Sequence, residues 1–555
     1  MLTGNAADTE LATNFETATS ESVLPKDNAS NNMEDGKDEA TPDDSTIFKG
    51  KRKIGIMLAL MLSTFLAGLD TSIISTMLPK ISEKFEALHL MAWIVSSYMI
   101  GITALLPIYG KLCQIFGYKN VLLTCHALFL VGTVICGASN SAGMLIAGRV
   151  IAGLGGGGLM TINYITVSDL VPPSESVMYL ALFSLMWGIA AVAGPLLGGV
   201  FADKTGFEWG FYINPIVQVV VVILVLIFLR IPRPKTTIVD KIKRIDFVGI
   251  ATLMAGIVML QLGLTWGGQD HSWKSPAVII SLILAVILLI AFVILEWKFA
   301  VEPIMPLRQF KHRNTCIMFA VQITYGMCYY LPQYYVPVYL TVVRNASALN
   351  AGMHLIPVIL SLSVASMITG FVIRYTGAYL PAIWFGTAIN AAGTGLFVLL
   401  GSNPSNGMLI GIPIVFGIGL GMAAQPTLTC AQNTVEQKDI ATMTSLFMTV
   451  QMLGGAVGQA VAQAVLRNRI SPMLDNIAAK FPNYADTIIN VTRDQSVIWK
   501  PNVPDNVRRE TIDAYVESIH TVYYVFLAFG LFTFISSLFV KNIPLRKTIN
   551  TDKDN

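Results

Sequence analysis

The chain has 555 residues, of which 54% are hydrophobic and 13% are charged, with a formal net charge of +3 and a mean hydropathy of +0.62. Soluble domains carry roughly 25% charged residues, so this composition excludes a soluble globular protein and predicts an integral membrane protein with many spans. The basic residues lie in loops between apolar runs, where they indicate membrane topology rather than nucleic-acid binding.

The first 48 residues differ in composition from the rest of the chain. They hold eleven acidic and two basic residues among many Asn, Ser and Thr. This segment is acidic and has no apolar stretch of the kind that a signal peptide carries. We therefore expect residues 1–48 to form a disordered cytoplasmic tail.

Fourteen segments have about 20 mostly apolar residues each, which is the length that a membrane-spanning helix needs. The chain is therefore expected to fold as an all-α integral membrane protein with 14 spans. In chain order the predicted spans are 54–79, 91–110, 120–139, 142–168, 177–202, 210–230, 247–266, 276–296, 314–340, 350–373, 380–401, 407–430, 440–466 and 521–540.

The distribution of Lys and Arg predicts the direction of the spans. With the N-terminus in the cytoplasm, the inside loops hold fourteen basic residues and the short outside loops hold five. This bias is the one that the positive-inside rule describes, and it places both termini in the cytoplasm. The long loop 468–518 then lies outside, with an N-glycosylation sequon at Asn490, and a second outside sequon begins at Asn345.

Three landmarks recur with a constant offset of 260 residues, which indicates an internal duplication. Gly110 and Gly117 follow span 2, Gly370 and Gly377 follow span 10, and the glycine clusters of spans 5 and 13 also match. Both copies keep the same membrane side, so the repeat is parallel. The expected division is an N-terminal six-helix half at 49–235, two inserted helices at 236–300, a C-terminal six-helix half at 301–541, and a cytoplasmic tail at 542–555.

Six motifs occupy defined places on these spans. Closely spaced glycines let helix backbones approach, and a proline inside a helix removes a hydrogen bond and kinks it. Such a surface suits helices that slide or rock, although tight static packing explains the same residues. The motifs are GLDTSIISTMLP at 68–79, GKLCQIFGYK at 110–119, LIAGRVIAGLGGGGL at 145–159, Gly188 with Gly194, Pro195, Gly198 and Gly199, WGFYINP at 209–215, and WGG at 266–268 with WKS at 273–275.

With these motifs the chain resembles the major facilitator superfamily, and more closely the fourteen-span drug:proton antiporters of fungi. The resemblance covers roughly residues 54 to 540. It implies two parallel six-helix halves around a binding site at the membrane midplane, plus two extra central helices. It also implies that Gly110, Gly117 and the glycine–proline motif of span 5 take part in the conformational change. The loop motif departs from the family pattern, because Gln114 stands for its Asp and Tyr118 for its Arg.

Asp70 and Arg149 are the charges predicted to lie deepest in the membrane. Both fall in the outer half of their spans, at similar depth. A carboxylate so far from water usually indicates a functional site. Beside a cation, such a carboxylate can bind and release a proton as the site opens to one side of the membrane and then to the other. We therefore predict that these two residues couple transport to protons. A static ion pair between spans 1 and 4 is the alternative, and His126 in span 3 is a weaker candidate for a proton relay.

Span 9 is rich in tyrosine and corresponds in the repeat to span 1, a position that lines the cavity. Gln322, Tyr325, Tyr329 and Tyr330 are therefore predicted to contact the substrate, because aromatic faces suit an amphipathic or cationic solute. The tyrosines nearer the outer end of the span fit an interfacial aromatic belt instead.

The function expected from the sequence is proton-coupled export of small amphipathic compounds such as drugs, toxins or metabolites. No phosphate-binding loop for ATP is present, and we expect no enzymatic activity, cofactor, metal or nucleic-acid partner. The protein is expected to act as a monomer in the plasma membrane, with protons, a small-molecule substrate and the lipid bilayer as its partners. A vacuolar proton antiporter for basic amino acids is the alternative. A third interpretation, a non-transporting sensor, fits less well because such proteins carry long cytoplasmic extensions.

Overall fold

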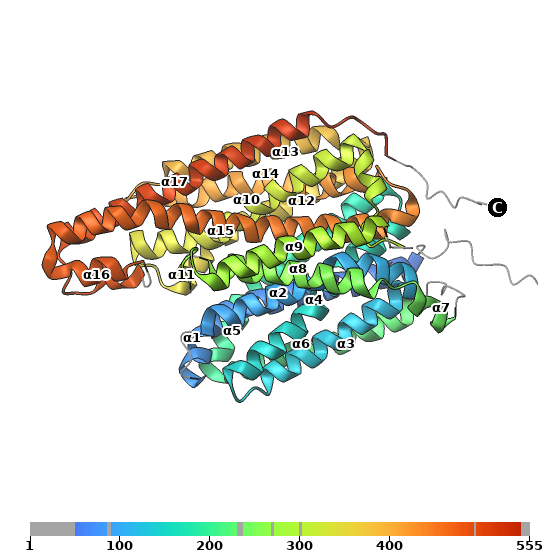
Figure 1. Cartoon of the computed structure of the whole chain (residues 1–555), viewed down its shortest axis with the longest axis horizontal. Coiled ribbons are helices and arrows are strands. Elements are labelled where there is room, and N and C mark those ends of the chain that lie inside the picture. Colours follow the sequence, from blue (N-terminus) through green and yellow to red (C-terminus); the bar gives the residue numbers. More distant parts are fainter. Residues whose placement is uncertain are drawn as a thin grey trace, which may run out of the picture. The chain divides into compact units, whose positions relative to one another are not determined.

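The computed structural model describes residues 50–85, 90–229, 237–267, 271–298, 302–492 and 495–545. The tail predicted at 1–48 and most of 542–555 lie outside these ranges. Long helices make up nearly all of the described chain (Figure 1). The α-helices are α1 Gly50–Phe85, α2 Met91–Phe116, α3 Tyr118–Gly137, α4 Ala142–Leu170, α5 Pro173–Lys204, α6 Glu208–Phe228, α7 Ile238–Lys243, α8 Phe247–Trp266, α9 Pro276–Lys298, α10 Arg313–Arg344, α11 Ala348–Met353, α12 Ile356–Thr376, α13 Leu380–Leu396, α14 Asn406–Gln432, α15 Ile440–Lys480, α16 Ala485–Asn490 and α17 Asp505–Leu538.

Each predicted span corresponds to one long helix of the described chain. Thirteen helices among the described residues are long and apolar enough to cross a membrane, and α10 is the long helix that does not join them. Its six tyrosines and its glutamines lower the mean hydropathy, but its 32 residues reach about 48 Å, enough to span a bilayer. The structure therefore agrees with the predicted all-α fold of 14 spans.

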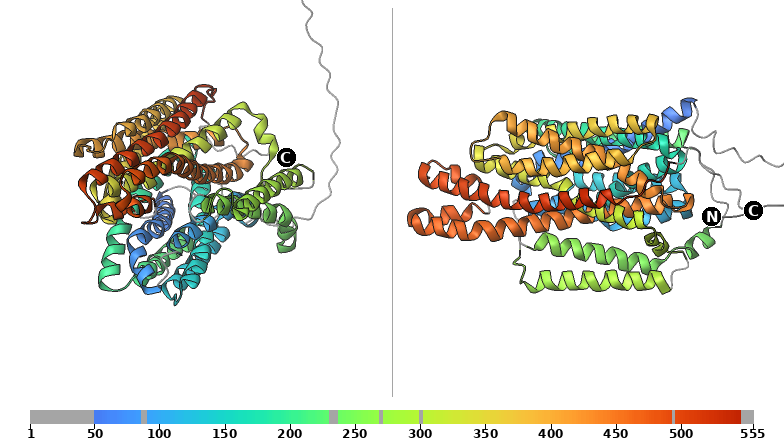
Figure 2. Two further views of the ribbon diagram at one scale, coloured as in Figure 1. Left: turned by 60° about the vertical axis from the view of Figure 1, so that its left-hand side comes forward. Right: turned by 90° about the horizontal axis from the view of Figure 1, so that it is seen from above.

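The long helices pack as two sets and a separate pair. Helices α1 to α6 pack on one another, as do α10 and α12 to α17. The two sets meet at two seams, where α5 packs on α12 and α2 packs on α15. Helices α8 and α9 pack together beside the two sets, and α8 contacts α2 and α15 (Figure 2). The domain boundaries that the sequence suggested stay a prediction.

The two seams use equivalent residues of the duplicated halves. At the α2–α15 seam, a Cβ on Gly110 would lie 2.5 Å from the carbonyl oxygen of Ala441. At the α5–α12 seam, a Cβ on Gly370 would lie 3.1 Å from the Cβ of Ala181. Gly370 and Ala441 follow Gly110 and Ala181 by 260 residues each. The duplication therefore places a glycine–alanine contact in each seam.

The second glycine of each landmark ends a helix. Gly117 has a φ of 84° and Gly377 a φ of 69°, in the left-handed region that favours glycine. Their N–H groups donate to the carbonyl oxygens of Cys113 and Ile373, at 2.9 and 2.7 Å. Gly117 and Gly377 thus end α2 and α12 with the same type of hydrogen bond, although their ψ angles of 146° and 0° differ.

Helices α15 and α17 continue past the ends of the predicted spans. We expected a long loop at 468–518, but α15 runs to Lys480 and α17 begins at Asp505. The ion pairs Arg469–Glu517 and Lys480–Glu510 join the two extensions, both at N···O distances below 2.7 Å. The apolar runs mark only the most hydrophobic part of these helices, and their extensions mix charged residues with buried ones such as Ile470 and Tyr515, so the extensions were missed. Figure 1 shows α15, α16 and α17 projecting beyond the other helices.

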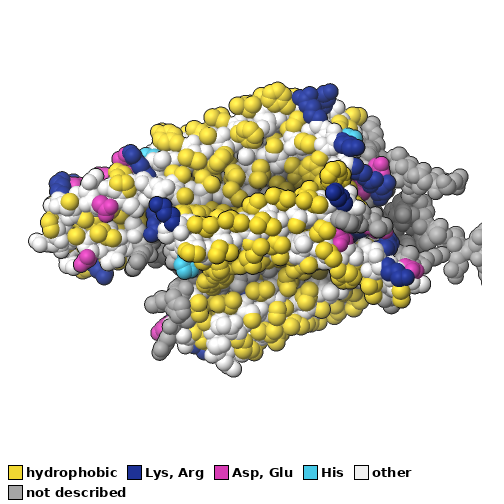
Figure 3. All heavy atoms as spheres, in the orientation of Figure 1, with side chains coloured by type: hydrophobic (Ala, Val, Ile, Leu, Met, Phe, Trp, Pro, Cys, Tyr) yellow, Lys and Arg dark blue, Asp and Glu magenta, His cyan; other side chains and the backbone are white. Residues whose placement is uncertain are grey.

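The surface of the helices is strongly apolar. Large hydrophobic side chains are exposed along α6, α8, α9 and α12, including Ile216, Ile280 and Ile368 at 55% or more. In Figure 3 hydrophobic side chains cover the middle of the visible face, while Lys, Arg, Asp and Glu gather towards its two ends. This pattern fits helices whose outer faces contact lipid.

The end where α1 begins and α2 ends is called the inner end below, and the opposite one the outer end, after the topology predicted from the sequence.

Candidate functional site

A cavity of about 650 Å³ lies between the two sets of helices. Its wall is built by α1, α2, α4 and α5 from one set and by α10, α12, α14 and α15 from the other, with Gln495 near the outer end. Pockets for drug-sized ligands have volumes of about 300–1,000 Å³. The cavity is therefore large enough to hold a small organic molecule.

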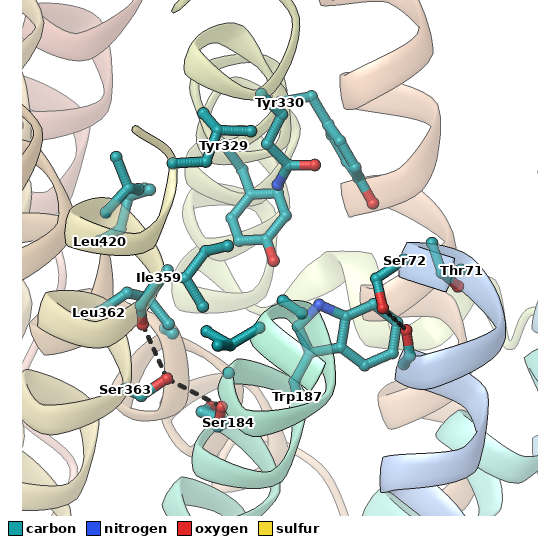
Figure 4. Close-up of a pocket in the computed structure, with 18 of the residues that line it drawn as sticks. Thr71, Ser72, Ser184, Trp187, Tyr329, Tyr330, Ile359, Leu362, Ser363 and Leu420 are labelled. Atoms are coloured by element: carbon teal, nitrogen blue, oxygen red, sulfur yellow. Dashed lines mark hydrogen bonds between the residues drawn. The ribbon is translucent and has the colours of Figure 1, made fainter. Parts of the chain in front are cut away.

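Aromatic side chains from both sets line this cavity. The four residues predicted in span 9, Gln322, Tyr325, Tyr329 and Tyr330, all lie in its wall. In Figure 4 Tyr329 and Tyr330 extend from α10 towards the space that Trp187 of α5 faces from the other side. Trp187 directly precedes the glycine motif of span 5. The sequence analysis did not predict Trp187 as a cavity residue, because it interpreted this part of the span only as a helix-packing motif. Substrate contact by these residues stays a prediction.

Polar groups in the wall are neutral. The described residues that line the cavity include no Asp, Glu, Lys, Arg or His side chain. Gln322 donates to the side-chain oxygen of Gln451 at 2.9 Å, and Gln425 donates to the hydroxyl of Ser184 at 3.0 Å. Ser363 donates to the backbone oxygen of Ser184 at 3.0 Å, a bond drawn in Figure 4. The site can thus form hydrogen bonds and ring contacts, but its wall supplies no formal charge.

Asp70 and Arg149 form a buried ion pair inside the α1–α6 set. Nη1 of Arg149 donates to Oδ2 of Asp70 at 2.5 Å, and the side chains are 1% and 0% exposed. Asn214 of α6 donates to Oδ1 of the same carboxylate at 3.0 Å. The guanidinium of Arg149 stacks over the ring of Tyr98 of α2 at 4.0 Å. One carboxylate therefore links α1, α4 and α6, with α2 covering the cation.

The ion pair faces away from the cavity. Thr71 and Ser72 of α1 line the cavity wall, whereas neither Asp70 nor Arg149 does. Successive residues of a helix point about 100° apart, so a side chain next to a cavity-facing one can lie on the buried face. The sequence placed Asp70 and Arg149 together correctly, but it could not show that α1 separates them from the cavity.

His126 lies on the same buried side of α1, two turns from the ion pair. Its Nε2 is 3.4 Å from the hydroxyl of Ser63, and the side chain of Gln218 donates to its backbone oxygen. The imidazole is 1% exposed. His126 is therefore packed in the core of the α1–α6 set and does not line the cavity, and a relay role stays untested.

Hydrogen bonds close the inner end between the two sets. Gln114 donates to the backbone oxygen of Lys438 at 2.5 Å and to the hydroxyl of Thr442 at 3.2 Å. Asp169 accepts from Gln437 at 2.9 Å and also from the hydroxyl of Tyr118. Gln114 and Tyr118, the two residues that depart from the family's loop motif, thus contribute neutral donors to this network, in which the carboxylate of Asp169 is an acceptor.

A charged cluster at the inner end adds to this closure. The carboxylate of Glu302 lies 2.7 Å from Nζ of Lys111 and 2.6 Å from Nε of Arg244. Partial burial raises the pKa of Glu302, but the hydrogen bonds and charges of Arg244 and Lys111 outweigh it, so this pKa lies below its ordinary value. Glu302 is therefore held as an anion between α2 and the segments that flank the α8–α9 pair.

The glycines of the α5 motif differ in what surrounds them. A Cβ on Gly194 would lie 2.1 Å from the hydroxyl oxygen of Ser72, and one on Gly198 would lie 2.6 Å from the backbone oxygen of Ile73. A Cβ on Gly188 would clash with Ser363 of α12, at 2.4 Å. Three glycines thus permit close approach of α5 to α1 and α12. For Gly199 this interpretation was wrong, because no atom lies within 4 Å of its built Cβ.

The cavity extends from the closed inner end towards the outer end of the helices, and Pro195 is among the residues that line it. Pro195 lies inside α5 and contributes to the wall. Ser75, Thr341 and Met353 extend the lining towards the outer ends of α1 and α10.

Asn345 and Asn490, the asparagines of the two outer sequons, are both exposed. Their glycosylation stays a prediction.

Comparison with known proteins places the chain in a family. The model of the Major Facilitator Superfamily matches residues 60–459. The chain belongs to the major facilitator superfamily. Members of this superfamily are membrane transporters of small molecules, so the protein is a multi-pass membrane transporter and not an enzyme.

Several fungal members of the superfamily are similar along most of their length. The MFS-type efflux pump LUC4 of Fusarium sp is 32% identical over 97% of this chain and 95% of its own. The efflux pump FUS6 of Gibberella fujikuroi is 33% identical, covering 91% and 92%. The efflux pump dotC of Dothistroma septosporum is 33% identical, covering 86% and 83%.

Solved structures of the superfamily share the fold. The human organic anion transporter MFSD10 (TETRAN) matches with a TM-score of 0.57 at 13% identity, covering 88% of this chain and 100% of its own. The proton:xylose symporter XylE matches with a TM-score of 0.56 at 12% identity, covering 88% and 96%. At this identity the similarity supports the fold of this superfamily member and nothing about its substrate.

Proposed function

We propose that this transporter exports small amphipathic compounds from the cytoplasm in exchange for protons, by alternating access. The observation that carries the proposal is the neutral, aromatic cavity between two helix sets, with a buried carboxylate sealed behind one wall. The three fungal relatives described above are named efflux pumps, which supports the direction of transport. They give no support to the vacuolar amino-acid alternative.

The conformation described here corresponds to an outward-facing state in this proposal. The hydrogen bonds of Gln114, Gln437 and Ser184 between the two sets lie on the inner side of the cavity. The cavity wall continues towards the outer end instead. Rocking of one set on the other about the α5–α12 and α2–α15 seams, where glycines allow close contact, would open the inner end and close the outer one.

Asp70 is the proposed proton carrier. As an anion it is fully buried and holds Arg149 and Asn214, which ties α1 to α4 and α6. A proton on this carboxylate removes the charge that attracts Arg149, so protonation loosens the contact between these helices. The alternative of a static ion pair predicts no change in coupling when Asp70 is made neutral, provided that the protein still folds.

The proposal includes a monomer in the plasma membrane with both termini in the cytoplasm. The positive-inside bias supports this orientation. A fluorescent tag fused to the chain, imaged in fungal cells, tests the location. Signal confined to the vacuolar rim contradicts the plasma-membrane assignment.

Transport itself is tested with purified protein in proteoliposomes. An imposed pH gradient, acidic on the outer side of the protein, is expected to drive accumulation of a fluorescent amphipathic dye on that side. Addition of a protonophore should remove the accumulation, and empty liposomes serve as the control. Accumulation that ignores the proton gradient contradicts proton coupling, and no dye movement under any gradient contradicts export.

A further inference from the structure

A short segment between α9 and α10 lies at the inner end of the molecule. It comprises residues 302–311 and is called the inner strap below. Its last five residues, Leu307–Lys311, form a 3-10 helix that contacts α10. The inner strap is therefore a covalent connection between the α8–α9 pair and the second helix set.

Glu302 ties the inner strap to the first helix set. Its carboxylate lies 2.7 Å from Nζ of Lys111 of α2, whose side chain is 13% exposed. Lys111 directly follows Gly110, the residue that packs closely on Ala441 at the α2–α15 seam. Arg244, which precedes α8, bonds the same carboxylate at 2.6 Å. One side chain of the inner strap thus holds both α2 and the segment before α8.

Arg308 ties the inner strap to the other side of the same seam. Its Nη2 donates to Oδ2 of Asp439 at 2.7 Å. Asp439 directly precedes α15 and lies two residues before Ala441, and its side chain is 12% exposed. The inner strap is therefore bonded to α2 and to the beginning of α15, close to the place where these helices meet.

The α8–α9 pair holds the inner strap in position. The N–H of Ile304 donates to Oε1 of Glu296 of α9 at 2.9 Å. Ile304 is 1% exposed and belongs to an apolar cluster of the pair, with Leu253, Ile257 and Phe292. The inner strap is thus seated on the two inserted helices by packing and by a backbone hydrogen bond.

A hollow of about 810 Å³ lies beside these ion pairs. Its described lining carries four cationic and three anionic side chains, namely Lys111, Arg244, Arg308, Lys438, Asp169, Glu302 and Asp439. Packed apolar groups would hold the helices together without ion pairs, whereas few atoms are in contact across a hollow. Removal of one ion pair should therefore weaken the closure measurably.

We propose that the inner strap is a latch that keeps the inner side of the transporter closed, and that the α8–α9 pair anchors it. The contacts run in series from Lys111 of α2 through the inner strap to Asp439 beside α15. When the inner ends of α2 and α15 part, at least one of these charge-assisted bonds must break. This assignment rests on the proposed alternating access and gives the two inserted helices a role in it.

Distances between spin labels test the latch on full-length protein in lipid nanodiscs. The labels are placed on Asn120→Cys of α3 and Tyr375→Cys of α12, which are exposed at the inner ends of opposite sets. Cys316, the exposed one of the six cysteines, is replaced by Ser. Pulsed electron paramagnetic resonance then gives the ratio of a longer, open distance to a shorter, closed one. Glu302→Gln and Arg308→Gln should each raise this ratio by about fivefold or more.

Two single variants control for charge and for position. Arg308→Lys keeps the positive charge and should bring the ratio back towards that of the wild type. Glu175→Gln removes a partly exposed ion pair with Lys53, also at the inner end, but this pair joins α1 and α5 within one set. It should leave the ratio unchanged.

A double variant tests whether the two links act in series. Glu302→Gln combined with Arg308→Gln should exceed the larger single effect by less than about twofold, because a strap released at one end no longer holds the other. Lys111→Met breaks the first link from α2 and takes the place of Glu302→Gln if that variant does not fold.

The outcomes separate the latch from the proposed function. An unchanged ratio when either link is broken overturns the latch, as does an equal rise in Glu175→Gln. Effects that multiply in the double variant overturn the arrangement in series. If the inner side opens as expected but no dye moves in proteoliposomes, the latch stands and the export function fails. Dye export together with unchanged distances overturns the latch alone.

Discussion

Neutralising Asp70 is the sharpest test of the buried ion pair. Asp70→Asn keeps the shape of the side chain and an acceptor for Asn214, but it leaves Arg149 without a counter-charge. Arg149 is 1% exposed and its closest anionic partner is Asp70 at 2.5 Å. Removing one partner of a buried pair destabilises a protein by about 3–5 kcal/mol.

The double variant Asp70→Asn with Arg149→Met tests whether this loss comes from the unpaired cation. Met keeps the apolar stem of Arg149 and removes its charge, and replacing a whole buried pair is often nearly neutral. We expect it to recover at least half of the lost stability. Glu517→Gln is the control, because its pair with Arg469 is half exposed and contributes about 0–1 kcal/mol.

Two assays on these variants separate stability from coupling. Thermal denaturation in detergent gives the stability order, and proteoliposomes report both gradient-driven accumulation and substrate exchange at equal pH. Asp70→Asn should lose the accumulation and keep the exchange, because exchange needs no net proton movement. Gradient-driven accumulation at the normal rate in this variant would falsify the proton-carrier assignment. Equal destabilisation of the single and double variants would refute the argument from the unpaired cation.

Three further predictions concern the seam, the inner end and the outer end. Gly110→Val places a Cβ 2.5 Å from the oxygen of Ala441, so it should lower stability by about 1–3 kcal/mol and slow transport, whereas Gly199→Val should change neither. The lowered pKa of Glu302 implies a stabilisation that is complete above about pH 4.3 and lost as the pH falls through the folded-state pKa. In the Glu302→Gln variant the melting temperature should therefore fall less than in the wild type as the pH is lowered below about 4.3. The same pH dependence in both proteins would contradict this prediction. Glycosidase treatment should increase the gel mobility of wild-type protein and leave Asn490→Gln less affected, and an unaffected wild type contradicts use of the sequon.

Sequence patterns predicted the helices well, because each span needs an apolar surface of defined length. They missed the extensions of α15 and α17, where charged residues such as Arg469 and Glu517 pair with each other outside the apolar runs. The 260-residue offset predicted an internal duplication, and the equivalent contacts of Gly110 and Gly370 agree with it. The sequence could show this because glycine alone has no side chain, so a glycine in a helix indicates a place where another helix can approach closely.

The site was predictable only in part. Charge and depth identified Asp70 and Arg149, and tyrosine content identified the cavity-lining face of α10. The sequence does not show which way a side chain turns about its helix axis, so it could not place Asp70 behind the wall. Trp187 was missed because a neutral residue in an apolar run carries no signal until its neighbours are known.

The α8–α9 pair makes the two seams unequal towards the lipid. Gln261 of α8 bonds Thr103 of α2, and α8 also contacts α15, so this pair covers the α2–α15 seam. The equivalent α5–α12 seam carries Ile189 and Leu360, which are 44% and 47% exposed. A molecule dissolved in the bilayer therefore meets a covered seam on one side and a bare one on the other. Among the described helices, the α8–α9 pair therefore breaks the symmetry of the duplicated halves, with one seam covered and the equivalent one exposed.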